Sequence, residues 1–257
     1  MTAFSSVRRL WSRLAPREAA LLWVLLSLAL LALLGPDLPA RADGGTTLAD
    51  ARSWRGLPNA MDVLSNLPFL AIGLWGLVRL HGLDHAHQRA QTALPASQQG
   101  QQAWGEPPVD ALDCAWLFFT GLMLTAAGSI FYHLQPDALR LAADHARESH
   151  CHAGTVGMAV CERVSQRAGW PAAWFTLGAG LLAVAVYHET SNVMSWAVVQ
   201  FGGMLLVLGL ALARPVQGAL GLRLGGVICF YALAKLFEFA DAALYEASAH
   251  WLSGHTL

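Results

Sequence analysis

Ser129, His133 and Asp144 are the residues of this chain whose types and spacing could do chemistry. Ser129 and His133 are four residues apart, so on a helix they share one face about one turn apart, and the hydroxyl could hydrogen-bond to a group that the histidine holds. An imidazole near a carboxylate is a common arrangement for a zinc ligand beside a general base. A structural interpretation stays open, because a serine can bond to the carbonyl four residues earlier and a histidine can lie at the membrane surface.

The chain that must position these residues has the composition of a polytopic membrane protein. Of its 257 residues, 55% are hydrophobic and only 13% are charged, and the mean hydropathy is +0.44. The apolar residues come in blocks, and roughly 20 of them cross the hydrocarbon core as a helix. We therefore predict an all-α membrane bundle with seven spans, the fourth of them short and an eighth just beginning at the C-terminus. The predicted spans cover residues 19–35, 60–82, 111–133, 154–164, 171–188, 193–213 and 222–246.

The positions of the arginines predict the orientation, because cytoplasmic loops are enriched in Lys and Arg. Residues 1–45 are expected to form a cytoplasmic N-terminus and a retained membrane anchor, with a cleaved signal peptide as the alternative. Residues 46–257 are expected to form the main transmembrane domain. With the N-terminus inside, the inner arginines are Arg8, Arg9, Arg13, Arg17, Arg79, Arg89, Arg163, Arg167, Arg214 and Arg223, and the outer ones are Arg41, Arg52, Arg55, Arg140 and Arg147.

The charge and the cysteines exclude other classes of partner and site. The net charge of −1 and the absence of a basic stripe argue against nucleic-acid binding. Cys114, Cys151, Cys161 and Cys229 have no CxxC spacing, so we interpret them as packing residues. Residues 83–109 are rich in polar side chains and are expected to form an inner loop.

The polar residues near the predicted spans converge on the outer leaflet. Polar residues with a structural role alone would divide between the two faces, so this one-sidedness favours a functional site. We expect Lys235 and Glu238 to neutralise each other as a structural pair on one helix. The converging residues are Asn59, Asp62, Ser65, Asn66, Ser129, His133, Asp144, Glu238, Asp241 and His255.

Four stretches together resemble the alkaline ceramidase superfamily of seven-helix hydrolases, which also contains the adiponectin-type receptors. Residues 59–69 (NAMDVLSNLPF) resemble the start of its first core helix, and residues 128–137 (GSIFYHLQPD) resemble its next motif, with Asp144 at the expected distance. Residues 234–241 (AKLFEFAD) and 253–257 (SGHTL) are similar to the C-terminal motifs of bacterial members. The likeness runs from about residue 50 to the end of the chain.

The resemblance implies a seven-transmembrane core, preceded here by an extra N-terminal helix, in a bacterial inner membrane with the site toward the periplasm. It implies that His133 and His255 ligate zinc, that Ser129 lies near the metal-bound water or the oxyanion, and that Asp144 moves protons. The implied reaction cleaves the amide of a ceramide-like lipid, which enters from the bilayer, to a sphingoid base and a fatty acid. No protein partner is expected. The alternative is a non-enzymatic, receptor-like or inactive protein of the same fold.

Two local features depart from the superfamily. A third zinc ligand is expected four residues after His255, at position 259, whereas the sequence ends at Leu257, so we expect a truncated form that lacks most of the last core helix. The stretch His145–His152 is strongly polar where an apolar helix is expected, and we interpret it as a sequence error or a lesion. Its His150 and His152 could alternatively supply substitute ligands.

Overall fold

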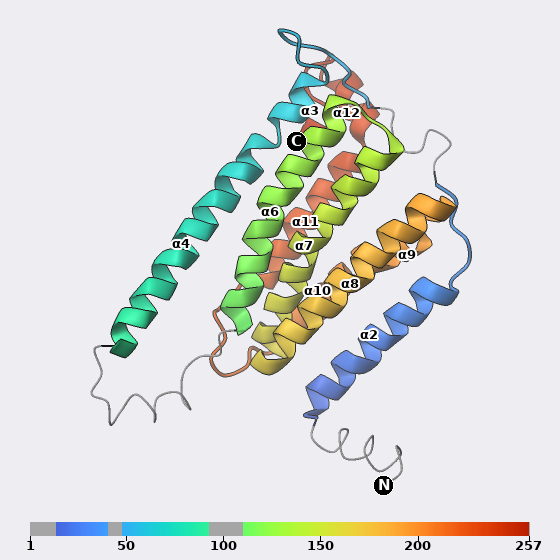
Figure 1. Cartoon of the computed structure of the whole chain (residues 1–257). Helices are drawn as coiled ribbons and strands as arrows, with labels where there is room; N and C mark the ends of the chain where they lie inside the picture. Colours follow the sequence, from blue (N-terminus) through green and yellow to red (C-terminus); the bar gives the residue numbers. More distant parts are fainter. Residues whose placement is uncertain (1–13, 41–47, 93–109, 257) are drawn as a thin grey trace.

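The computed structural model of the chain describes residues 14–40, 48–92 and 110–256 (Figure 1). Within these ranges all regular structure is helical, apart from the isolated β-bridges Pro39–Asn192 and Trp54–Leu57. The helices are α2 (Pro16–Leu34), α3 (Ala60–Leu64), α4 (Leu67–Thr92), α6 (Asp110–Leu134), α7 (Ala138–Arg163), α8 (Gln166–Thr190), α9 (Met194–Ala197), the π-helical η1 (Val198–Gly202), α10 (Gly203–Ala211), α11 (Leu224–Phe239), α12 (Asp241–Ala247) and the 3-10 turn η2 (Gly254–Thr256).

Five helical segments in the described part of the chain are long and apolar enough to cross a membrane. Each overlaps one of the predicted spans, so the all-helical fold is confirmed and the segments support a membrane protein, while the number of seven spans is not confirmed. Helix α4 also continues to Thr92, so the inner loop expected from residue 83 begins later, and residues 93–109 lie outside the described ranges. The five segments are Pro16–Leu34, Ala60–Ala86, Ala111–Leu134, Gln166–Thr190 and Met194–Ala211.

Helix α7 corrects the short span predicted over 154–164. It is one continuous helix of 26 residues, and its polar first half packs inside the bundle. The ring of His145 stacks on Trp196 with centroids 4.8 Å apart, and Nε2 of His152 lies 3.0 Å from the carbonyl oxygen of Val199. Neighbouring helices thus contact polar side chains that hydropathy alone assigns to no membrane helix, and the interpretation of this stretch as a sequence error or lesion stays a prediction.

The span predicted over 222–246 is also corrected, because it is divided into α11 and α12 at Ala240. Ala240 has backbone angles outside the helical region (φ −92°, ψ 14°). The expected pair on α11 is confirmed, since Nζ of Lys235 lies 2.5 Å from Oε2 of Glu238. The break turns the first residue of α12, Asp241, toward the segment that ends at Thr256.

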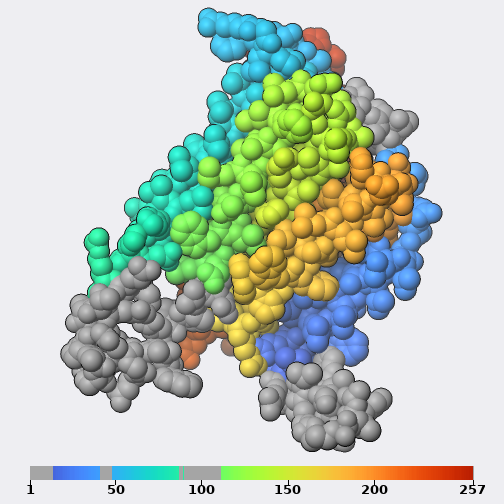
Figure 2. Space-filling view, in the orientation of Figure 1, coloured from blue at the N-terminus to red at the C-terminus, as the bar shows by residue number. Residues whose placement is uncertain are grey.

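The centre of the bundle consists of α6, α7 and α8, which pack closely through small residues. A Cβ atom at Gly154 would lie 2.5 Å from the backbone nitrogen of Phe118, so α6 and α7 approach at nearly backbone distance. Val156, Val160 and Val207 form a fully buried apolar layer between α7 and α10. Helix α4 lies along α6, and α2 lies on the opposite side of the bundle (Figure 2).

Helix α2 is attached to the bundle at both of its ends. The buried carboxylate of Glu18 accepts hydrogen bonds from Ser165 (2.6 Å) and from Nε and Nη2 of Arg167 (2.7 and 2.6 Å). At the other end, the backbone nitrogen of Val193 donates to the carbonyl of Leu38 at 2.8 Å. The N-terminal helix is therefore packed as part of the bundle.

Candidate functional site

The first part of the candidate site lies where the short helix α3 meets the C-terminal end of α6. Asn59 precedes α3 in a left-handed conformation (φ 45°), and its Nδ2 donates a 2.7 Å hydrogen bond to the carbonyl of His133. This bond places Asp62, in the first turn of α3, opposite the His133 ring. Oδ2 of Asp62 lies 3.8 Å from Nδ1 of His133, a distance too long for a hydrogen bond.

Both side chains of this pair are buried, and the two facing atoms are unsatisfied. Asp62 is 1% exposed and His133 5%. Among the described residues, neither Oδ2 of Asp62 nor Nδ1 of His133 has a hydrogen-bond partner. A buried polar atom without a partner costs roughly 1–3 kcal/mol. Two unsatisfied atoms that face each other, here Oδ2 of Asp62 and Nδ1 of His133, indicate a binding position for a third group.

The C-terminal segment brings a second histidine to the same place. Gly254 permits this approach, because a Cβ atom there would collide with the carbonyl of Phe237 in α11. His255 follows in η2, and its ring centroid lies 6.1 Å from that of His133, with the two planes at 78°. From the same segment, the buried Ser253 hydroxyl lies 3.4 Å from Oδ1 of Asp62. Residues far apart in the sequence thus converge at one end of the bundle.

Asp241 holds His255 in this position. Its Oδ1 accepts a 3.0 Å hydrogen bond from the backbone nitrogen of His255, and its Oδ2 lies 3.3 Å from Nδ1 of the His255 ring. The backbone nitrogen of Ala49 also points to Oδ2, at 3.3 Å. A carboxylate beside one ring nitrogen fixes the tautomer and orientation of an imidazole, which leaves the other nitrogen available as an acceptor or ligand.

The loop before α3 closes this end of the bundle. Asp50 is 1% exposed and accepts hydrogen bonds from Nε and Nη2 of Arg52 at 2.8 and 2.6 Å. These contacts hold the pKa of Asp50 below its usual range, although burial acts in the opposite direction. Arg52 also donates to the carbonyl of Trp251 at 3.1 Å, so the loop is tied to the segment that carries His255.

Of the four site residues predicted from the sequence, the structure brings His133 and His255 together. Ser129 lies on α6 one turn before His133, deeper in the bundle. Asp144 lies on α7 at a similar depth, since its Oδ1 is 3.3 Å from the position of a Cβ atom built on Gly128. The charged groups that act on Asp144 are those of Glu148, Arg147 and Glu238, and its Oδ1 has no hydrogen-bond partner among the described residues.

Asp62, Asp241 and Ser253 complete the geometry. Asp62 and Asp241 were among the polar residues expected to converge on the outer leaflet but had no catalytic or metal-binding role assigned, and Ser253 was not singled out. The sequence places Asp62 and Asp241 at the outer ends of predicted spans, but such acidic residues can equally cap helices or form ion pairs. Ser253 begins the SGHTL stretch, but nothing in the spacing of a single serine in a polar segment predicts its contact with Asp62. Only the return of the chain to α3 identifies it.

The donor atoms of this site suit a zinc ion in chemical type. Zinc binds imidazole nitrogen and carboxylate oxygen, and the unsatisfied pair of Asp62 and His133 supplies one of each beside the His255 ring. Within the described ranges, no group of three or more His, Cys, Asp or Glu side chains meets the geometry of a metal site. Asp62, His133 and His255 thus match zinc in donor type, with Asp241 behind His255, although their side chains as placed in the described structure do not form a metal-binding group.

Comparison of the chain with models of known protein families, with curated proteins and with solved structures gives no match. The inference of function therefore depends on the residues and their geometry.

Proposed function

We propose that this chain is a zinc-dependent membrane hydrolase that cleaves the amide of ceramide-like lipids to a sphingoid base and a fatty acid. The observation that supports the proposal best is the convergence of Asp62, His133 and His255 from three separate elements onto one buried, unsatisfied centre. The resemblance of residues 59–69 and 128–137 to alkaline ceramidases supports the same reaction. On this proposal the fold is the seven-helix type of that superfamily, in a bacterial inner membrane with the site toward the periplasm.

His133, His255 and Asp62 would hold the zinc ion. Bound there, zinc would supply a Lewis acid and a nucleophilic water whose pKa is lowered toward 7. Asp241 would keep Nδ1 of His255 turned toward itself through the 3.3 Å contact, so that Nε2 is the ligating atom. Asn59 would fix the end of α6 through its bond to the His133 carbonyl.

Ser129 and Asp144 would act one turn deeper, where the scissile amide of a lipid is expected to lie. The Ser129 hydroxyl would donate to the developing oxyanion, and Asp144 would accept the proton that the attacking water loses and pass it to the leaving amine. The unsatisfied Oδ1 of Asp144 is available for this transfer, since no described residue binds it. On this proposal the substrate with its two long chains would reach these residues laterally from the lipid, and a site inside the bundle would exclude bulk water.

The test measures zinc content and turnover of a short-chain fluorescent ceramide by the purified full chain in detergent. His133→Ala and His255→Ala are expected to lose bound zinc and to reduce turnover by about a thousandfold or more. His85→Ala is the matched control, because His85 is an exposed histidine on α4. Zinc that depends on His133 and His255 without turnover would favour the receptor-like alternative, and zinc binding that survives both substitutions would overturn the site.

A further inference from the structure

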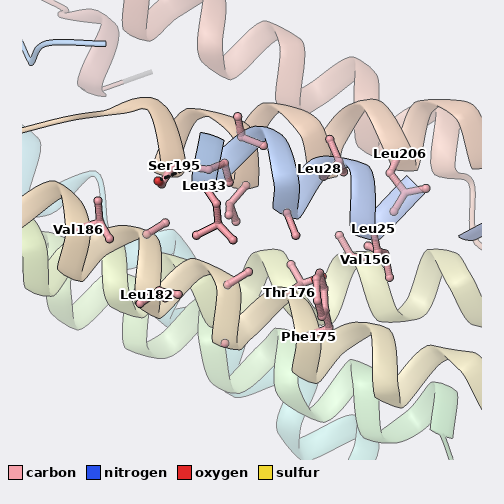
Figure 3. A pocket seen from close by; sticks show the side chains of 18 of the residues that line it. Leu25, Leu28, Leu33, Val156, Phe175, Thr176, Leu182, Val186, Ser195 and Leu206 are labelled. Atoms are coloured by element: carbon pink, nitrogen blue, oxygen red, sulfur yellow. Dashed lines mark hydrogen bonds between the residues drawn. The ribbon is translucent and has the colours of Figure 1, made fainter. Parts of the chain in front are cut away.

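An apolar cavity of about 390 Å³ lies between α2, α8 and the segment from α9 to α10 (Figure 3). Its two hydroxyl groups donate internally, Ser195 to the carbonyl of Ala32 and Thr176 to that of Ala172, each at 2.8 Å. A ligand therefore meets a mostly hydrocarbon surface, in which both hydroxyl groups of the described lining already donate to backbone carbonyls. The walls include Leu25, Leu28 and Leu33 from α2, Phe175 and Leu182 from α8, and Leu206 from α10.

A second, polar cavity of about 730 Å³ adjoins it, and Val186 on α8 borders both. It lies between the loop after α2, the start of α7 and the C-terminal end of α8. Its lining includes Asp37, His188 and Asn192, and Nδ2 of Asn192 donates to Oδ1 of Asp37 at 2.7 Å. Among the described residues this lining contains one carboxylate and no lysine or arginine.

We propose that the two adjoining cavities form a binding site for one membrane phospholipid with an amine-bearing headgroup. A hydrocarbon chain fills the apolar cavity, where burial of methylene groups drives binding. The ammonium group lies in the polar cavity near the carboxylate of Asp37, which disfavours an anionic headgroup. This site is separate from the Asp62 and His133 centre and does not depend on the proposed hydrolase function.

The test measures lipid retention by the purified full chain with native mass spectrometry, after exchange into phosphatidylethanolamine or phosphatidylglycerol. Gly178→Leu fills the apolar cavity, because Gly178 lines it and a Cβ atom there meets no neighbour within 4 Å. Gly209→Leu is the matched control, since Gly209 is an exposed helical glycine outside the cavity with equally open space. Ala29→Leu fills the cavity from α2 and serves if Gly178→Leu does not fold.

The wild-type chain is expected to retain phosphatidylethanolamine over phosphatidylglycerol. Gly178→Leu should weaken retention by roughly tenfold or more, because the leucine occupies the room of about three methylene groups, and Gly209→Leu should not. Asp37→Asn should bind both lipids alike. Equal retention by Gly178→Leu and Gly209→Leu would overturn the cavity as the site, and equal binding of both lipids by the wild type would overturn the headgroup assignment.

Discussion

The substitution Asp62→Asn is expected to stabilise the chain in the absence of zinc. The Asp62 carboxylate is 1% exposed, its Oδ1 has only the 3.4 Å contact with Ser253, and its Oδ2 has no partner among the described residues. A buried polar group left unsatisfied costs roughly 1–3 kcal/mol, and more when it is charged. An asparagine removes the charge, and its amide can donate to Nδ1 of His133. We expect a gain of about 1–2 kcal/mol in the free energy of unfolding, or roughly 2–8 °C in Tm.

Asp50→Asn is the matched comparison, because Asp50 is equally buried but fully paired. Its carboxylate binds the backbone and guanidinium nitrogens of Arg52 at 2.6–3.0 Å. Removing its charge should destabilise the chain by about 1–2 kcal/mol, after allowance for the solvent around the half-exposed Arg52. The assay is thermal unfolding in detergent with a chelator present. If Asp62→Asn lowers Tm as Asp50→Asn does, the carboxylate has a structural partner and the reasoning about an unsatisfied site fails.

If Asp62 is a zinc ligand, added zinc should make the wild type more stable than Asp62→Asn. A metal that binds only the folded state stabilises it by about 2.7 kcal/mol at a hundred times its Kd. The wild type should gain this amount, whereas Asp62→Asn should gain less because it lacks the anionic oxygen. A Tm gain from zinc that is equal in both proteins would exclude Asp62 from the metal site.

Three further predictions concern the pH dependence at Asp50, the packing of α6 against α7 and the role of Asp241. The stability advantage of the wild type over Asp50→Asn should be present at pH 7, begin to shrink below about pH 4, the ordinary pKa of aspartate, and be lost as the pH falls through the lowered folded-state pKa of Asp50; unfolding at several pH values checks this. Gly154→Ala should lower the free energy of unfolding by about 1–3 kcal/mol, because the added methyl group forces α6 away from α7. Gly82→Ala should not destabilise the chain, because a Cβ atom at Gly82 meets no neighbour within 4 Å. Denaturant unfolding of the two variants checks this. Asp241→Asn should lower ceramide turnover less than His255→Ala, because Asp241 orients the ring and is not a proposed ligand.

The apolar spans could be predicted from the sequence, because a helix that crosses the bilayer needs a long run of mostly apolar residues and a hydropathy profile detects such runs. The five apolar segments follow from composition alone. Helix α7 could not, since His145, Glu148 and His152 contact Trp196, Gln200 and Val199 on other helices, and such contacts leave no local pattern in the sequence. The break between α11 and α12 at Ala240 could not be predicted either, because alanine favours the interior of a helix.

The residues of the candidate site also differ in how well the sequence predicts them. His133 could be predicted, because a histidine that closes an apolar helix has a known depth and face. The positions of Asp62, Ser253 and Asp241 relative to it depend on two segments without helical periodicity, residues 48–59 and 248–253, which return to the end of the bundle. The rigid helix α6 thus fixes His133, the first proposed ligand, and irregular segments position the other proposed site residues. A substitution that loosens Arg52 from the carbonyl of Trp251 should therefore displace His255 and leave His133 in place, which separates the two contributions to the site.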